Sequence, residues 1–354
     1  MNLLRVLAII LVSLAIVQPR CVSQESTAKD LTSPSPVAGA LDATSSQSVT
    51  HEPWDVLSTA DMTLKPEPPI VGEKVSLPGF TRELLRVEWR KGDPIDLYVI
   101  RPVNVAHPPV VLYLYSFPSE SERFLNNAFC RMLTKDGYAA VGFVSALTGP
   151  RYHDRPVKEW FISELQESLG TSVHDVQMVL NYLSTRGDLD MNRVGMFGQG
   201  SGGTIAILAG AADPRIKAID VMDPWGDWPD FLAKSLIVPE SERASYLKPE
   251  FLARVAPLDP VRWIPQLKTR PIRLQEALFN PLVPDSARKQ IETAAPVGVE
   301  LAQYRDTKEY SEKVSANGKM LDWLHTKLQP TTESLTAKAL LQHAVVADKQ
   351  EKAQ

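Results

Sequence analysis

The chain alternates between short apolar runs and segments with the period of an amphipathic helix. Residues 110–115 and 138–144 are nearly continuous apolar runs, which are typical of strands buried on both faces of a sheet. Between residues 173 and 183 the apolar side chains recur every three or four positions, which predicts a helix that Ser172 caps. The remaining strands are expected at 84–89, 95–100, 193–197, 218–222, 272–277 and 299–304, and the remaining helices at 123–135, 204–212 and 286–295.

This order of elements predicts an α/β fold. Residues 84–89 and 95–100 are separated by a short polar turn, so the sheet is expected to start with an antiparallel hairpin. The later strands alternate with helices, and parallel strands need such crossover connections. We therefore expect a doubly wound, mostly parallel sheet flanked by helices, with a cap or lid inserted at about residues 225–265.

The first 23 residues predict a secretory signal peptide. A basic start is followed by an apolar run at residues 6–17, and Cys21, Val22 and Ser23 provide small residues for signal peptidase. The apolar run is shorter than the roughly 20 residues that span a bilayer. We therefore expect an exported protein, periplasmic or extracellular, with no stable membrane span after cleavage.

The rest of the chain divides into three parts. Residues 24–65 are rich in Ser, Thr, Ala and Pro at their start and predict a flexible leader. Residues 66–330 hold the alternating elements and form the expected main domain. Residues 331–354 predict an appended helix or tail, because apolar residues recur there at helical spacing.

Composition and charge narrow the class of protein. Hydrophobic residues make up 44% of the chain and charged residues 23%, which is ordinary for a globular protein. The formal net charge is −4 and no basic stripe is present, so nucleic acid is not an expected partner. After signal cleavage Cys130 would be the one remaining cysteine, and its apolar neighbours predict a buried side chain.

A glycine-dense turn stands between a predicted strand and a predicted helix at residues 192–203. Gly198 to Gly203 matches the dinucleotide pattern Gly-x-Gly-x-x-Gly, which leaves a cofactor-binding turn as one alternative. A dinucleotide turn normally lies in the first βαβ unit, whereas this one follows at least four predicted strands. No lysine follows the glycines, so a Walker loop is excluded. No cofactor is expected.

With this turn in place, residues 84–328 resemble the α/β-hydrolase superfamily, especially its dienelactone-hydrolase and prolyl-oligopeptidase-like branches. The resemblance implies a Gly-x-Ser-x-Gly elbow at the turn, followed by an acid and a histidine after later strands. The implied nucleophile position is Gly200, and the implied acid position is Asn280. No histidine follows the last strand, where Glu309 is nearest. The resemblance therefore implies a degenerate triad and a non-catalytic protein with a binding or interaction role.

An active serine esterase or peptidase-like hydrolase is the alternative. It would use Ser201 or Ser116 as a non-standard nucleophile, with His153 as base and Asp154 orienting its ring. A third possibility is a scaffold protein that has no ligand pocket.

Ligands of doubly wound sheets bind beyond the carboxyl ends of the strands. At this edge we expect a small-molecule, sugar or peptide ligand, in a pocket formed by Tyr115, Gln199, Trp225, Asp227 and Trp228. Alternatively, the two tryptophans belong to a lid and pack over the sheet instead of contacting a ligand. No group of residues has the spacing of metal ligands, so no metal is expected.

Overall fold

A computed structural model describes residues 52–62, 64, 66–114, 121–147 and 162–330 of the chain. These residues belong to one compact unit that starts at residue 51. The predicted signal peptide, most of the leader and the C-terminal tail lie outside the described residues.

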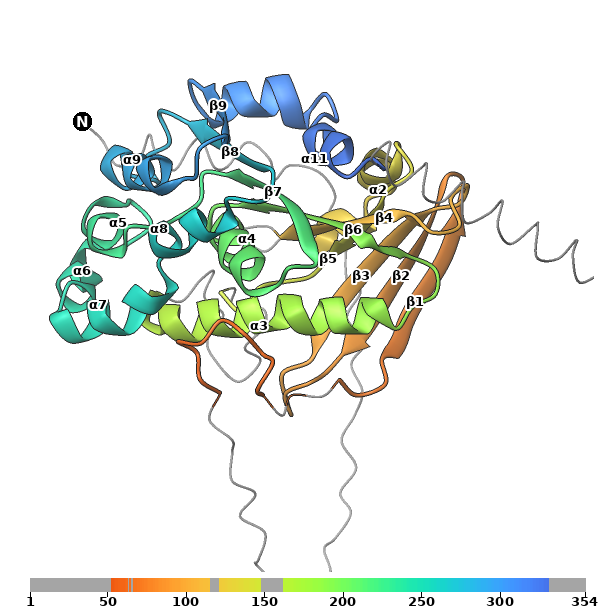
Figure 1. Cartoon of the computed structure of the whole chain (residues 1–354), viewed down its shortest axis with the longest axis horizontal. Helices are drawn as coiled ribbons and strands as arrows, with labels where there is room; N and C mark the ends of the chain where they lie inside the picture. Colours follow the sequence, from red (N-terminus) through yellow and green to blue (C-terminus); the bar gives the residue numbers. More distant parts are fainter. Residues whose placement is uncertain (1–51, 63, 65, 115–120, 148–161, 331–354) are drawn as a thin grey trace, which may run out of the picture. The chain divides into compact units, whose positions relative to one another are not determined.

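The described residues contain a nine-stranded sheet (Figure 1). Its strands are β1 (Ile70–Leu77), β2 (Phe80–Val87), β3 (Ile95–Pro102), β4 (Pro109–Leu114), β5 (Ala139–Gly142), β6 (Asp190–Gln199), β7 (Ile216–Met222), β8 (Ile272–Ala277) and β9 (Glu300–Tyr304). Their order across the sheet is β1-β2-β3-β5-β4-β6-β7-β8-β9. The pairs β1–β2, β2–β3 and β3–β5 are antiparallel, and the others are parallel. The expected mostly parallel sheet with an antiparallel start is confirmed.

Helices cover both faces of the sheet. The α-helices are α2 (Asn127–Thr134), α3 (Leu165–Ser184), α4 (Ser201–Ala212), α5 (Trp228–Lys234), α6 (Glu240–Tyr246), α7 (Pro249–Val255), α8 (Pro260–Trp263), α9 (Asp285–Ala294), α10 (Thr307–Tyr310) and α11 (Asp322–Lys327). Single turns of other helix types lie at η2 (Ser121–Leu125), η4 (Ile162–Glu164), η5 (Ala256–Leu258), η6 (Ile264–Leu267) and η7 (Ser311–Ser315). In Figure 1, α3 and α4 lie along one face, while α2 and α11 lie over the other.

A hydrophobic core lies on each face of the sheet. Successive side chains along a strand point to opposite faces, so each strand contributes residues to both cores. In β4, Val110, Leu112 and Leu114 point to the face that α3 and α4 cover. Val111 and Tyr113 point to the opposite face, where they meet residues of α2 and α11. Burial on both faces explains why these strands read as continuous apolar runs.

The start of the folded unit and the start of α3 both correct the sequence expectations. Leu57, which lies in the predicted leader, is 5% exposed and belongs to the core, so the folded unit begins before residue 66. Ser172 is no cap, because α3 starts seven residues earlier at Leu165. The Ser172 hydroxyl instead donates to the carbonyl of Ser168 and accepts from the amide of Ala146.

Among the described residues, the helices are too short or too polar to cross a bilayer. Cys130 is a free thiol with no exposed surface, which confirms that it is a buried small side chain.

Candidate functional site

The parallel strands bring their carboxyl ends to one edge of the sheet, and the tight turn between β6 and α4 lies there. Gly200 fills this turn with φ +54° and ψ −121°, a conformation that glycine adopts far more easily than other residues. Its amide donates to the carbonyl of Met222 on β7 at 2.9 Å, and its carbonyl accepts from the amide of Thr204 at 3.1 Å. The backbone is therefore held in this turn from both sides.

Neighbouring glycines let the strand and helix approach closely. A Cβ atom at Gly198 would collide with the backbone of Gly202, and one at Gly203 would lie 3.2 Å from Pro224. Ser201 begins α4 and has no exposed surface. The turn thus places Gly200 at its tip and Ser201 within the packed helix. Gln199, the last residue of β6, is partly buried beside it.

Asp223 and Asn280 meet where β7 and β8 end. The Asn280 amide donates to Asp223 Oδ2 at 2.7 Å, and the Ala277 amide donates to Asp223 Oδ1 at 2.9 Å. Burial raises the pKa of Asp223 to about 6, although both hydrogen bonds act to lower it. Asp223 also has φ +47°, which is uncommon outside glycine and recurs at functional sites.

Asn280 was expected at this site from the resemblance, whereas Asp223, the carboxylate that accepts its hydrogen bond, was not. Asp223 directly follows a buried strand, and this was the signal that could have identified it.

The two tryptophans of the cap contribute to the core. Trp225 and Trp228 are 3% and 1% exposed, and the Trp228 indole donates to the carbonyl of Leu258. Their faces are therefore not available to a ligand here, which corrects their assignment as pocket residues and fits the lid alternative.

Asp227 lies at the start of α5 with φ +53°. Burial and the nearby carboxylates of Asp259 and Asp230 raise its pKa.

Exposed apolar side chains flank Asn280. Leu278, Phe279 and Leu282 in the loop after β8 are 38%, 75% and 40% exposed, and Leu236 is 64% exposed. The Leu236 amide donates to the carbonyl of Pro281, and the Ser235 hydroxyl donates to the carbonyl of Leu282, so the segments at 235–236 and 278–282 are adjacent. We call Leu236, Leu278, Phe279 and Leu282 the apolar patch.

In the described residues, Glu309 makes no contact with Gly200, Asp223 or Asn280. It lies in α10, where its carboxylate pairs with Lys313 and accepts from the amide of Arg305. Those contacts, with the hydrogen bond from Lys313 the strongest, hold the pKa of Glu309 below its usual range. Tyr115, Ser116, His153 and Asp154 lie outside the described residues.

The histidines in the described part of the chain lie away from the carboxyl edge. His107 precedes β4 and therefore lies at the amino edge, and His174 lies within α3, where its ring contacts Glu52 and Val56. His325 in α11 is 4% exposed and therefore buried.

His325 belongs to a polar group at the amino edge of the sheet. Its Nδ1 lies 2.9 Å from Asp136, and these two residues and Asp322 offer ligand atoms within 4.8 Å of one another. Lys135 lies 2.9 Å from Asp322 and supplies a positive charge there. A cavity of about 620 Å³ adjoins this group. Among the described residues, Asp136, Asp322 and His325 form the group that could hold a metal ion.

Comparison with known proteins gives a match in fold. No family model matches the chain, and no curated protein matches it in sequence. The acetyl xylan esterase from Paenibacillus sp. R4 matches with a TM-score of 0.57 at 16% identity, over 78% of this chain and 93% of that one. The S-formylglutathione hydrolase from Agrobacterium tumefaciens matches with a TM-score of 0.55 at 16% identity, over 73% and 99%.

A third structure agrees with these two. Acetyl xylan esterase 1 from Thermoanaerobacterium sp. JW/SL YS485 matches with a TM-score of 0.54 at 14% identity, over 73% of this chain and 88% of that one. The chain has the α/β-hydrolase fold.

Within the α/β-hydrolase fold, the strand-to-helix turn after the central strand is the nucleophile elbow. Here that elbow is the turn at Gly200, between β6 and α4. Gly200 lies at the tip of this turn, and Ser201 follows it as the first residue of α4.

Proposed function

We propose that this α/β-hydrolase-fold protein is non-catalytic and binds an organic ligand at the carboxyl edge of its sheet. The observation that carries the proposal is the backbone of Gly200, which adopts a positive-φ turn that glycine tolerates and that has no side chain at its tip. A serine hydrolase of this fold attacks its substrate from that position with a hydroxyl group. A glycine there offers no atom that can attack and be regenerated.

The surroundings of Gly200 support the same proposal. In the described residues, the position expected for the acid holds Asn280, whose amide donates to Asp223 rather than orienting an imidazole. Glu309 is paired with Lys313, and the described histidines lie elsewhere. Removing covalent chemistry does not remove the edge at which ligands of such sheets bind.

The apolar patch supports a binding role. Clustered exposed apolar side chains on a globular protein mark an interaction site more often than isolated ones do. The ligand that suits this edge has an apolar part for Phe279 and polar groups that can bond near Asn280. A small molecule, a sugar carrying an apolar group, or a peptide meets this requirement. We further propose that the protein acts after export, in the periplasm or outside the cell, as its first 23 residues indicate.

The binding role is tested with the fluorescent probe 8-anilinonaphthalene-1-sulfonate. We expect the folded protein to bind the dye and Phe279→Ser to weaken binding roughly tenfold, because burying a phenyl ring contributes about 1.5–3 kcal/mol. Val297→Ser is the matched control, since Val297 is fully exposed and lies outside the apolar patch. Equal affinity of wild type and Phe279→Ser would contradict a binding role for the patch.

Active hydrolysis remains the second candidate, because solved structures of the same fold are named as esterases and hydrolases. It requires Ser201, which has no exposed surface here, or Ser116 with His153. Covalent labelling with a fluorophosphonate probe separates the two candidates.

A further inference from the structure

The polar group at the amino edge of the sheet joins two elements that are far apart in the sequence. Asp322 and His325 lie on α11, and side chains three positions apart on a helix share a face. Asp136 lies in the turn between α2 and β5, 189 positions before His325. Because this third residue comes from a distant segment, the spacing of residues along the chain did not indicate the group.

Packing fixes the imidazole ring of His325. Tyr138 stacks on the ring with a centroid distance of 4.0 Å and an interplanar angle of 6°, and its hydroxyl donates to the carbonyl of His325 at 2.5 Å. Nδ1 lies 2.9 Å from the carboxylate of Asp136, and the buried Nε2 has no hydrogen-bond partner among the described residues. Burial lowers the pKa of His325, which favours the neutral ring that binds metal ions. A ring that is already oriented loses little conformational freedom when it binds an ion.

The group attracts a cation. The carboxylates of Asp136 and Asp322 face the ammonium group of Lys135, which lies 3.9 Å from the first and 2.9 Å from the second. Arg193 also lines the adjoining cavity, but it pairs with Asp190 at 2.7 Å. With a neutral imidazole, two negative charges therefore face one positive charge. The position of Lys135 shows that a cation is stabilised between the two carboxylates.

The distances within the group suit a small metal ion. The three ligand atoms lie within 4.8 Å of one another. A tetrahedral ion with bonds of about 2.0–2.2 Å separates its ligand atoms by about 3.4 Å. The side chains of Asp136 and Asp322 are 47% exposed, so rotation about their side-chain bonds can close the remaining distance. The cavity of about 620 Å³ leaves room for a water molecule at a fourth position.

We propose that Asp136, Asp322 and His325 bind a divalent transition-metal ion of the zinc type, which fastens α11 to the turn before β5. An imidazole nitrogen together with carboxylate oxygens suits Zn²⁺, whereas Mg²⁺ and Ca²⁺ prefer oxygen ligands alone. Nδ1 supplies the imidazole ligand while the ring carries its proton on Nε2, and the ion displaces Lys135 from Asp322. The site lies at the opposite edge of the sheet from Gly200, so it does not depend on the proposed ligand-binding role.

Isothermal titration calorimetry with ZnCl₂ tests the site. The full chain is purified without a histidine tag and stripped with a chelator before titration near pH 7. We expect one zinc ion to bind per chain, and MgCl₂ to bind far more weakly at the same concentration. A titration that shows no one-to-one zinc binding would overturn the proposal.

Asp322→Asn is the decisive variant. Asparagine keeps the shape of the side chain, and its oxygen can still accept from Lys135, but it lacks the charge of the carboxylate. We expect zinc affinity to fall by about 100-fold or more, since losing a group that merely orients a ligand already costs about 10–100-fold. Asp285→Asn is the matched control, because Asp285 also begins a helix and pairs with a basic side chain, Arg288 at 3.0 Å.

The control should bind zinc like the wild type. Wild-type affinity in Asp322→Asn would mean that the ion binds elsewhere, and the proposal would fail. Lys135→Gln should change the affinity in the opposite direction. We expect zinc to bind up to about fivefold more tightly, because the ammonium group no longer competes for Asp322. Weaker binding by this variant would contradict the assigned position of the ion.

A further measurement uses the wild-type protein alone. Hydrogen exchange read by mass spectrometry is compared with and without zinc, at a concentration about 100 times the dissociation constant. Protection of peptides from α11 should rise by up to about 100-fold, because opening of this helix releases the ion. Peptides from α9 should exchange equally in both samples. Unchanged protection of α11 would overturn the proposal.

Discussion

At the scale of single residues, the elbow is defined by a backbone conformation rather than by a side chain. Gly200 keeps the positive φ that this turn demands, and its amide and carbonyl are both bonded. Glycine adopts this conformation readily, so the turn keeps its shape without a side chain at its tip. The conformation, and not a contact of the side chain, is what a substitution at this position disturbs.

We predict that Gly200→Ala destabilises the protein by about 1–3 kcal/mol, the cost of holding a residue with a Cβ atom in a sparsely populated conformation. Urea unfolding measures the change. Gly187→Ala is the control, because a Cβ atom there has open space and the backbone needs no positive φ. A Gly200→Ala variant as stable as the control would show that the turn is not strained.

Asp223 predicts a pH dependence. Its pKa is about 6 in the folded protein and about 3.9 in an unfolded chain, so the folded state holds the proton to higher pH. Between these values the contribution of Asp223 to stability falls as the pH rises, by about 2–3 kcal/mol in all. Asp223→Asn lacks this loss and should gain stability relative to wild type from pH 4 to pH 6.

Thermal unfolding of wild type and Asp223→Asn across that range provides the check, and the difference between the two proteins removes the contribution of other groups. A difference that stays flat with pH would mean that the carboxyl group titrates normally.

At the scale of elements, one threonine joins the elbow helix to the cap. The Thr204 hydroxyl on α4 donates to the carbonyl of Trp225 at 2.6 Å and accepts from its amide at 3.0 Å. The side chain thereby fixes the start of the cap against the helix that follows the elbow.

Thr204→Val keeps the shape of the side chain but removes both hydrogen bonds, so we predict a loss of about 2–4 kcal/mol from two buried backbone groups. Urea unfolding of this variant is compared with that of Thr293→Val, which removes an exposed hydroxyl on α9. Equal stability of the two variants would show that the bridge to Trp225 contributes nothing.

Elements differ in how far the sequence could predict them. Strands such as β4 and β5 were predictable because burial on both faces leaves a continuous apolar run. The edge strand β1 was missed, since most of its side chains are exposed and Gly72, Glu73 and Lys74 interrupt any alternation. The first two turns of α3 were missed because Ser168, Gly170 and Thr171 are weak helix formers, which tertiary burial overrides.

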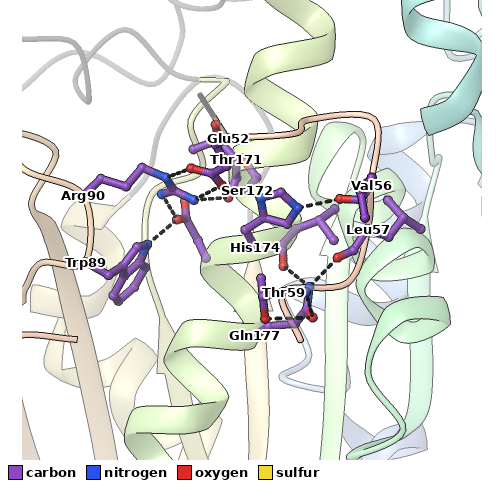
Figure 2. Close-up of polar contacts among 12 residues, drawn as sticks. Glu52, Val56, Leu57, Thr59, Trp89, Arg90, Thr171, Ser172, His174 and Gln177 are labelled. Atoms are coloured by element: carbon purple, nitrogen blue, oxygen red, sulfur yellow. Dashed lines mark hydrogen bonds and ion pairs between the residues drawn. The ribbon is translucent and has the colours of Figure 1, made fainter. Parts of the chain in front are cut away.

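At the scale of the whole molecule, the candidate site depends on contacts that no local pattern contains. The turn was predictable because four glycines fall within residues 198–203, directly after a predicted strand. The hydrogen bond between Asp223 and Asn280 joins two residues that lie 57 positions apart in the sequence. The burial of Trp225 and Trp228 depends on how the cap folds back over the sheet. Residues 52–62 likewise depend on a long-range contact (Figure 2), since Glu52 contacts His174, which lies 122 positions away in the sequence.

The central claim is that the elbow holds no activated nucleophile. It is tested most directly by treating the purified protein with a fluorophosphonate probe and measuring its intact mass, beside an active serine hydrolase as control. Our account predicts an unchanged mass under conditions that label the control completely. An adduct that maps to Ser201 or Ser116 and is lost on prior denaturation would contradict it and establish the protein as an active hydrolase.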